Sequence, residues 1–291
     1  KVVERGEAKV TIVVSSGLHI DFLITKPASY GALLQHFTGS KLHNIHLRII
    51  AEKKGLSLSE YGVRKLKSTS QSSNLITTKT EEDLYGLLEM QTPPPEIRED
   101  TGEIEAGLSH KLPKLIELDD IKGDLHLHSN FQIQPSHDLG ANSIKEIARK
   151  GKELGYKYIG LSEHQPSRAN HTEKQIIELI LKKKKLIEQQ NYSDKSIRVL
   201  NLLELDIMPD GDISVSEEAL NLLDFAIAGV HSVHHQSKDE MTKRLIKALE
   251  NPYIKVLTHP TGRLLNERSS SDANWEEVFK TAAKYNKAME I

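Results

Sequence analysis

The chain has 291 residues, of which 37% are hydrophobic and 27% are charged, values ordinary for a soluble globular protein with room for two domains. Its formal net charge of -2 excludes a generally basic, polyanion-binding protein, although local basic patches remain compatible with phosphate binding. The absence of cysteine excludes disulfides, thiolate nucleophiles and cysteine-ligated zinc, so any metal ligands must be His, Asp or Glu.

The sequence shows no targeting signal. No apolar run approaches the roughly 20 residues that cross a bilayer, and the first residues lack the pattern of a signal peptide. We therefore expect a cytoplasmic protein with no membrane partner, and a monomer. The chain does not begin with Met, and both of its ends resemble the interior of a strand, so we expect a fragment of a longer protein.

The N-terminal part of the chain predicts a small mixed α/β region. Residues 9–14 and 18–25 are typical of two strands joined by a Ser-Ser-Gly turn, which predicts a β-hairpin. Residues 29–37 and 41–54 are typical of helices, and Gly55 is a suitable C-cap for the second helix.

The segment from Gln91 to Asp120 is rich in Pro, Glu and Asp and has no apolar period, which predicts a surface linker and a domain boundary. Beyond it, predicted strands alternate with predicted helices. The strands are 122–127, 157–162, 197–205, 224–230, 254–258 and one beginning at 287, and the helices are 143–154, 173–190, 216–222, 238–250 and 273–285. Repeated βα units predict a parallel sheet closed into a barrel, and the Lys182–Lys185 run predicts a solvated helix face.

Residue types that bind metals occur at the end of almost every predicted strand of this second region. They are Asp124, His126, His128, His164, Glu204, His231 and His259. The carboxyl ends of barrel strands converge on one face, so these residues are expected to be neighbours. Two histidines at positions i and i+2 project to the same side of a strand. Imidazoles combined with carboxylates suit zinc, manganese or iron rather than calcium.

Each of these residues taken alone has an ordinary structural explanation. A single His-x-His is more often a surface pair, and Glu204 alone would be interpreted as a salt-bridge partner; only the joint pattern favours a metal site. Arg263 follows the strand of His259 and is placed either to bind a phosphate through two hydrogen bonds or to form a structural salt bridge. His234 and His235 are interpreted as solvated loop residues.

Five motifs in chain order resemble the PHP (polymerase and histidinol phosphatase) domain. They are Gly123–Ser129, Gly155–His164, Glu204–Gly211, Ala228–Ser232 and Thr258–Arg263. The segment Gln35–Asn44 resembles the thumb of a bacterial family-X DNA polymerase. The two resemblances together cover essentially the whole chain.

The resemblance implies an α/β fold with a distorted (βα) barrel of PHP type. It places the end of a polymerase palm at 1–26, a thumb at 27–90, the linker at 91–120 and a C-terminally truncated PHP domain at 121–291. The implied function is DNA repair of the base excision type. In it, a metal-dependent 3′–5′ exonuclease is attached to a DNA-directed DNA polymerase, and DNA and a deoxynucleoside triphosphate are the implied partners.

The resemblance also implies the residues of both sites. The PHP ligands, which would hold Mn or Zn and activate water, are His126, His128, Asp138, His164, Glu204, His231 and His259, and a further Asp-x-His would follow Ile291. Asp21 resembles the third palm carboxylate, which binds Mg, whereas the other two would precede Lys1. Phe37, Gly39 and Asn44 correspond to residues that bind the incoming nucleotide.

Three functions remain open from the sequence. The first is a hydrolase that acts on DNA 3′ ends through its PHP domain. The second is a nucleotidyltransferase whose PHP domain is a structural metal-binding partner, and the third is a metal-binding scaffold without turnover. The nearly complete ligand set favours the hydrolase.

Overall fold

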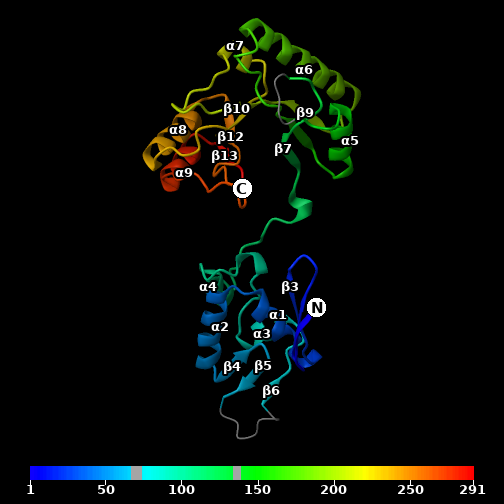
Figure 1. Cartoon of the computed structure of the whole chain (residues 1–291), viewed down its shortest axis with the longest axis vertical. Coiled ribbons are helices and arrows are strands. Elements are labelled where there is room, and N and C mark those ends of the chain that lie inside the picture. The colour runs from blue at the N-terminus through cyan, green and yellow to red at the C-terminus, as the bar shows by residue number, and fades with distance from the viewer. Residues whose placement is uncertain (67–73, 134–138) are drawn as a thin grey trace. The chain divides into compact units, whose positions relative to one another are not determined.

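The protein is described by a computed structural model that covers residues 1–66, 74–133 and 139–291 (Figure 1). The chain divides into two compact units, Lys1–Leu115 and Ile116–Ile291. None of the described helices combines the length and apolar character that a bilayer span requires.

Unit 1 begins with a three-stranded antiparallel sheet. Its strands, in spatial order, are β1 (Val2–Arg5), β2 (Lys9–Val13) and β3 (His19–Leu23). The predicted hairpin is confirmed, because Thr11 pairs with Asp21 across β2 and β3 and Gly17 lies in the connecting turn with φ 83°. A residue without Cβ adopts this φ at no steric cost.

The two predicted helices of unit 1 are confirmed as α1 (Tyr30–Thr38) and α2 (Lys41–Lys53). The Ser40 side chain caps α2 by accepting a hydrogen bond from the His43 N–H at 3.4 Å. The remaining elements of the unit were not predicted. They are the antiparallel strands β4 (Leu56–Ser59), β5 (Gly62–Lys65) and β6 (Leu75–Ile76), the helix α3 (Glu81–Leu87), the 3₁₀ turn η2 (Pro95–Ile97) and the helix α4 (Glu103–Leu108).

Part of the predicted linker 91–120 is packed into unit 1, which corrects the expectation of a surface segment. Helix α4 lies inside this range, and its Ile104 is fully buried with Leu84 and Tyr85 of α3. Arg98 is also buried and donates a hydrogen bond to Pro93 O at 2.9 Å. A helix of six residues is too short to show an apolar period, which is why the sequence pattern missed it.

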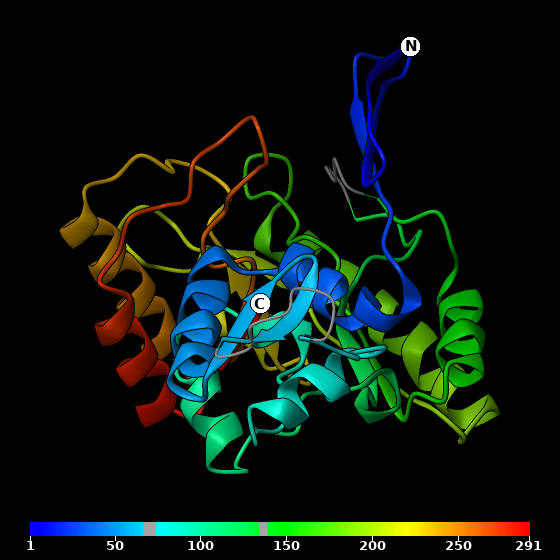
Figure 2. The ribbon, with the colours of Figure 1, turned by 90° about the horizontal axis from the view of Figure 1, so that it is seen from below.

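Unit 2 alternates strands and helices as predicted. Its elements are η3 (Leu118–Asp120), β7 (Gly123–Leu127), α5 (Ile144–Glu153), β8 (Tyr158–Leu161), α6 (Glu173–Ser193), β9 (Arg198–Asn201), β10 (Glu204–Asp206), α7 (Glu217–Leu220), β11 (Ala226–Gly229), α8 (Lys238–Glu250), β12 (Ile254–Leu257), α9 (Trp275–Lys284) and β13 (Ala288–Met289). All strand pairs within unit 2 are parallel, and α8 and α9 pack side by side (Figures 1 and 2).

Local sequence signals explain where these helices begin. Ser143, Thr172 and Ser237 each cap a helix and accept a hydrogen bond from the backbone three residues later, while the residue at that position bonds back to the cap. This reciprocal arrangement satisfies two backbone donors that a helix start leaves free. The helices then cover the apolar strands, whose residues form the two buried clusters of the unit.

The strands of unit 2 form two parallel sheets, β7-β8-β9 and β10-β11-β12-β13. The single strand predicted at 197–205 is wrong, because it divides into β9, which pairs with β8, and β10, which pairs with β11. Leu202 and Leu203 lie between the two strands and are fully buried, so the apolar run contains no break that would mark the division. Ladder pairing among the described strands does not close the two sheets into the predicted barrel.

Candidate metal centre

Six of the predicted ligands lie together in unit 2, five of them at or just after the carboxyl end of a strand and Glu204 at the amino end of one. They are His126 in β7, His128 directly after it, His164 after β8, Glu204 at the start of β10, His231 after β11 and His259 after β12. With Leu127 they line one cavity of about 450 Å³. A parallel sheet brings its strand ends to one edge, which is why residues more than 130 positions apart in the chain meet here.

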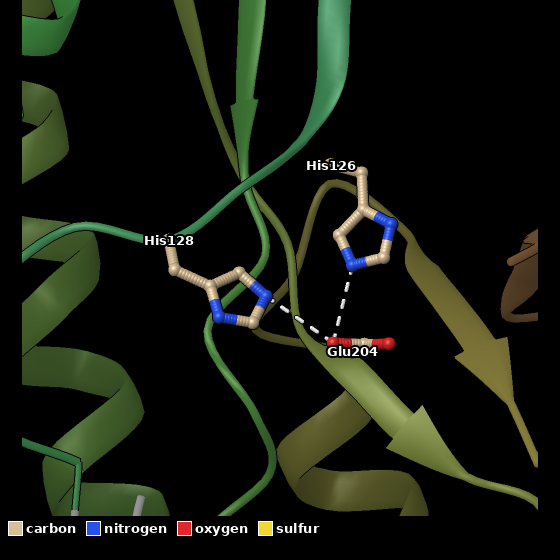
Figure 3. Close-up of side chains that lie close together, drawn as sticks. All are labelled: His126, His128 and Glu204. Atoms are coloured by element: carbon tan, nitrogen blue, oxygen red, sulfur yellow. Dashed lines mark ion pairs between the residues drawn. The ribbon is translucent and has the colours of Figure 1, made fainter. Parts of the chain in front are cut away.

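Glu204 lies at the centre of this cluster, and only 2% of its side chain is exposed. Its Oε2 is 3.2 Å from Nε2 of His126 and 3.2 Å from Nε2 of His128 (Figure 3). Its Oε1 is 2.9 Å from Nε2 of His231 and 2.8 Å from Nε2 of His259. Nδ1 of His164 is 3.3 Å from Oε2, so both oxygens of this one carboxylate contact histidines of the cluster.

The shared carboxylate changes the electrostatics of the cluster. Burial opposes ionisation of Glu204, but hydrogen bonds with His126, His128, His231 and His259 hold its pKa far below the ordinary value. Burial likewise opposes the charged form of His126, but Glu204 and a second carboxylate raise its pKa to about 10. The site therefore combines an ionised, buried carboxylate with imidazole rings that hydrogen-bond to it.

The donor set fits divalent metal ions. Two groups of three ligand atoms lie within 4.8 Å of one another, namely His126, His128 and Glu204 in one group and His164, Glu204 and His231 in the other. Imidazole nitrogens with a carboxylate suit zinc, manganese or iron. Because Glu204 belongs to both groups, two neighbouring ions would share it.

Two further sequence predictions have different outcomes. Asp138 lies outside the described residues. Asp124, which the strand-end pattern included, does not line this cavity; its Oδ1 accepts a hydrogen bond from the His126 N–H at 3.0 Å.

Sequence reasoning missed two carboxylates that contact histidines at Nδ1, the ring nitrogen that faces away from Glu204. Glu290 follows β13, and its Oε1 is 2.8 Å from Nδ1 of His126. Asp206 ends β10, and its Oδ1 is 2.6 Å from Nδ1 of His231. The signal that would have found them is the one used for the ligands, since both are acidic residues at a strand end.

A buried ion pair lies beside the cluster, between Lys183 of α6 and Glu163, the neighbour of His164. Lys183 is fully buried and also donates hydrogen bonds to Leu161 O at 2.8 Å and to Leu202 O at 2.5 Å. The prediction that the whole Lys182–Lys185 run is solvated is therefore wrong at this position.

His234 was also interpreted incorrectly as a solvated loop residue. Its Nε2 accepts a hydrogen bond from Arg268 NH1 at 2.8 Å, and burial together with the positive charge of Arg268 lowers its pKa. Arg268 also donates to Gly262 O at 2.6 Å, so it braces the loop that carries Arg263. Arg263 itself is exposed and lies among residues 263–269, which line a cavity of about 340 Å³.

The candidate polymerase residues lie in unit 1. Asp21 is on β3, where its Oδ1 accepts a hydrogen bond from Thr11 at 2.5 Å and its Oδ2 is 3.4 Å from the Lys9 ammonium. The neighbouring Lys9 ammonium and the Thr11 hydroxyl lower the pKa of Asp21. An ionised, partly exposed carboxylate of this kind is chemically able to bind a metal ion.

The predicted nucleotide-binding residues lie around the junction of α1 and α2. Phe37 is near the end of α1 with 55% of its surface exposed, and Gly39 follows with φ 80°. Asn44 accepts a hydrogen bond from Gln35 Nε2 at 2.6 Å and donates one to His36 O at 2.8 Å. The Asn44 amide therefore has a defined orientation.

Comparison with known proteins agrees with both halves of this description. Residues 33–99 match the DNA polymerase beta thumb family, so the match extends into the predicted linker and lies wholly within unit 1. The DNA polymerase/3'-5' exonuclease PolX of Bacillus subtilis is 34% identical over 294 residues, which cover 100% of this chain and 49% of that protein. The chain is therefore similar over its whole length to a DNA polymerase/3'-5' exonuclease, and part of unit 1 matches a polymerase thumb.

Other relatives are named as phosphatases and match a little over half of this chain. A probable phosphatase of Caldicellulosiruptor bescii is 30% identical over 154 residues, which cover 52% of this chain and 58% of that protein. A probable phosphatase of Thermoanaerobacter sp. is 26% identical over 172 residues, 58% of this chain and 63% of that protein. The chain thus spans about half the length of this polymerase relative and less than two thirds of these phosphatases.

Proposed function

We propose that unit 2 is a PHP-type phosphoesterase that hydrolyses phosphoester bonds at DNA 3′ ends, as a 3′–5′ exonuclease acting in DNA repair. The observation that carries this proposal is the convergence of five histidines on the buried carboxylate of Glu204 in one cavity. The printed names of the relatives, a polymerase/3'-5' exonuclease and several probable phosphatases, support the same chemistry.

We propose that two or more divalent ions, Mn or Zn, are held by the six clustered residues, with Asp138 as a further ligand. A bound divalent ion supplies a Lewis acid that neutralises phosphate charge and lowers the pKa of water. Glu204 contributes by offering both of its oxygens to the histidines of the site. No cysteine is present to act as a nucleophile, which agrees with direct hydrolysis by water.

Arg263 is proposed to bind the phosphate of the DNA end. Its guanidinium is exposed on the loop that begins at His259, and Arg268 holds the start of that loop through Gly262. A guanidinium donates two parallel hydrogen bonds to a phosphate, which both attracts the strand and fixes its direction. We also propose that the two sheets of unit 2 form a distorted barrel of PHP type.

Unit 1 is proposed to belong to a DNA-directed DNA polymerase that takes DNA and a deoxynucleoside triphosphate as partners. The thumb match supports this proposal, and it gives Asp21 the role of a Mg ligand. The exposed Phe37, Gly39 and the oriented amide of Asn44 would contact the incoming nucleotide.

The test measures Mn²⁺-dependent release of nucleotides from a 3′-labelled single strand of DNA. We expect the unmodified protein to release nucleotides and His128→Ala to abolish the release, because His128 is one of the ligand candidates. Asp21→Asn serves as the matched control, since Asp21 lies in the other unit, and its release rate should be unchanged.

The second candidate function is a nucleotidyltransferase whose PHP domain binds metal only as a structural partner. The buried, hydrogen-bonded Glu204 is the observation that favours it, because a bound ion there would link strands β7, β10 and the loops after β11 and β12. Metal binding without release of nucleotides, in this chain and in a version extended past Ile291, would support this function and contradict the hydrolase.

A further inference from the structure

Two carboxylates lie behind the histidine cluster, outside the residues that line its cavity. Glu290 contacts His126 and Asp206 contacts His231, in each case at the ring nitrogen opposite the one that faces Glu204. We propose that Glu290 and Asp206 are positioning residues that direct Nε2 of these two histidines toward bound divalent cations. This inference rests on the metal site of the proposed function.

The contacts of His126 assign a separate role to each ring nitrogen. Nδ1 is 2.8 Å from Glu290 Oε1, and Nε2 is 3.2 Å from Glu204 Oε2. An ionised carboxylate can only accept a hydrogen bond, so Glu290 selects the form of the ring that carries a proton on Nδ1. The lone pair of a neutral His126 is then on Nε2, which faces the cavity, and the adjacent anion makes that nitrogen more basic.

Glu290 also fixes a second ligand through the backbone. Its Oε2 accepts a hydrogen bond from the His259 N–H at 2.6 Å. His259 has φ 26°, a conformation that side chains with a Cβ rarely adopt, so an external hydrogen bond helps to hold it. Both carboxylate oxygens of Glu290 are therefore used, each on a different candidate ligand.

The contact between Glu290 and His126 also joins the two sheets of unit 2. Its backbone N–H donates to Leu257 O at 2.9 Å, which continues the pairing of β13 with β12. Strand β7 pairs with β8 in the other sheet, so the contact with His126 joins the two sheets across edges that no described ladder connects. A shift of one sheet relative to the other would move His126 away from the other ligands.

Asp206 repeats the arrangement at His231. Its Oδ1 is 2.6 Å from Nδ1, while Nε2 of the same ring is 2.9 Å from Glu204 Oε1. Gln165 orients Asp206 in turn, because it accepts a hydrogen bond from the Asp206 N–H at 3.2 Å and donates to Oδ2 at 3.4 Å. The same carboxylate–imidazole unit thus occurs once in each of the two ligand groups.

The test measures the affinity for Mn²⁺ and Zn²⁺ by competition with a chromophoric chelator. Outer carboxylates of this kind typically change metal affinity by about 10-fold to 100-fold, and we expect Glu290→Gln to weaken binding in this range. In Gln an NH2 group, which cannot accept, replaces one of the two oxygens that Glu290 uses for His126 Nδ1 and the His259 N–H, so one of these contacts is lost. Glu188→Gln, the same change at an exposed position on α6, should bind metal like the unmodified protein.

Asp206 supplies an independent test. We expect Asp206→Ala to weaken metal binding by a similar factor, and Asp206→Asn to weaken it less, because its amide oxygen still accepts from His231 Nδ1. The Nδ1–H proton signals of His126 and His231 in the Zn²⁺-loaded protein give a second readout, since a carboxylate partner shifts them downfield. Each signal should move only in the variant of its own partner.

The outcomes distinguish this inference from the proposed function. If the unmodified protein binds neither metal, the metal site of the proposed function is wrong. If it binds metal while Glu290→Gln and Asp206→Ala bind equally tightly, with unchanged Nδ1–H signals, the positioning role is overturned and the metal site stands. The fluorescence of Trp275, the single tryptophan of the chain, confirms that unit 2 is folded in each variant.

Discussion

At the scale of single residues, the central role of Glu204 follows from its two oxygens. Oε2 faces His126 and His128, whereas Oε1 faces His231 and His259. A carboxylate in this position is a candidate bridge between two ions, whereas each histidine of the two ligand groups belongs to one group only. The two kinds of ligand should therefore differ in what their removal does.

Metal stoichiometry tests that difference. We expect His128→Ala to lose one bound ion, because the group of His164, Glu204 and His231 does not include His128. Glu204→Gln should lose both ions, because Glu204 belongs to both groups. Metal analysis after removal of free ions provides the measurement, and equal losses in the two variants would argue against a shared carboxylate.

A buried polar network in unit 1 makes a prediction about pH. His43 is fully buried between Glu103, with Nδ1 2.6 Å from Oε1, and the Tyr85 hydroxyl, 2.9 Å from Nε2. Burial lowers the pKa of His43, so the group favours the folded state above its unfolded pKa of about 6.5. That contribution is lost as the pH falls from 6.5 through the lowered pKa, and the melting temperature should fall over the same window.

His43→Gln is the comparison for this prediction, because Gln does not titrate. The difference in melting temperature between pH 7.5 and pH 5.0, followed by circular dichroism, should be smaller in this variant than in the unmodified protein. At pH 7.5, where His43 does not carry a charge, the substitution should lower the free energy of unfolding by about 1–3 kcal/mol, because the buried hydrogen bond to Glu103 or to Tyr85 is lost. An identical pH response in both proteins would contradict the assignment to His43.

At the scale of elements, α6 is tied to two strands of unit 2 by the ammonium of Lys183. The ammonium bonds to carbonyl oxygens at the end of β8 and directly after β9, and it pairs with Glu163. Burial disfavours ionisation of Glu163, but Lys183 and Ser129 hold its pKa below the ordinary value. The pair thereby fixes the segment that carries His164.

Removing one partner of the Lys183–Glu163 pair should lower the free energy of unfolding far more than replacing both. We expect Lys183→Ala to lower the free energy of unfolding by about 3–5 kcal/mol, because it leaves a buried carboxylate without compensation. Lys183→Met combined with Glu163→Gln should cost less, since no uncompensated charge remains. Urea unfolding followed by Trp275 fluorescence measures both. Lys182→Ala, one residue away and exposed on α6, is the control.

The loop after β12 makes a separate prediction about substrate binding. Loss of a charge-assisted hydrogen bond typically costs about 1.5–3 kcal/mol, so Arg263→Ala should raise KM for 3′-end hydrolysis by about 10-fold or more. The value of kcat should change less, because Arg263 is proposed to bind the strand rather than the reacting water. Arg149→Ala, an exposed arginine on α5, is the control. A fall in kcat with KM unchanged would contradict the proposed binding role.

At the scale of the whole molecule, the metal-ligand groups of the described residues all lie in unit 2. A ligand that binds only the folded state stabilises it by about 2.7 kcal/mol at a free concentration of 100 times Kd. We expect chelation of metal to lower the unfolding temperature reported by Trp275, which lies in unit 2. The protection of the His43 region against hydrogen exchange should remain unchanged, and a loss in both units would contradict this division.

The order of elements and the candidate ligands of unit 2 were predictable from local sequence patterns. Strand and helix patterns depend on apolar residues at short spacings, and capping residues such as Ser143 and Ser237 act on the next few positions. Ligands at strand ends are marked by the same local pattern, and six of the seven predicted PHP ligands meet in one cavity.

The residues that contact those ligands from outside the cavity could be found only in the tertiary structure. Glu290 and Asp206 acquire their partners through contacts between different strands, and Lys183 is buried because α6 packs against β8 and β9. The division of one apolar run into β9 and β10 likewise depends on pairing with two different neighbours. Such contacts join residues far apart in the chain, whereas sequence patterns report the burial of a position and not the identity of its partner.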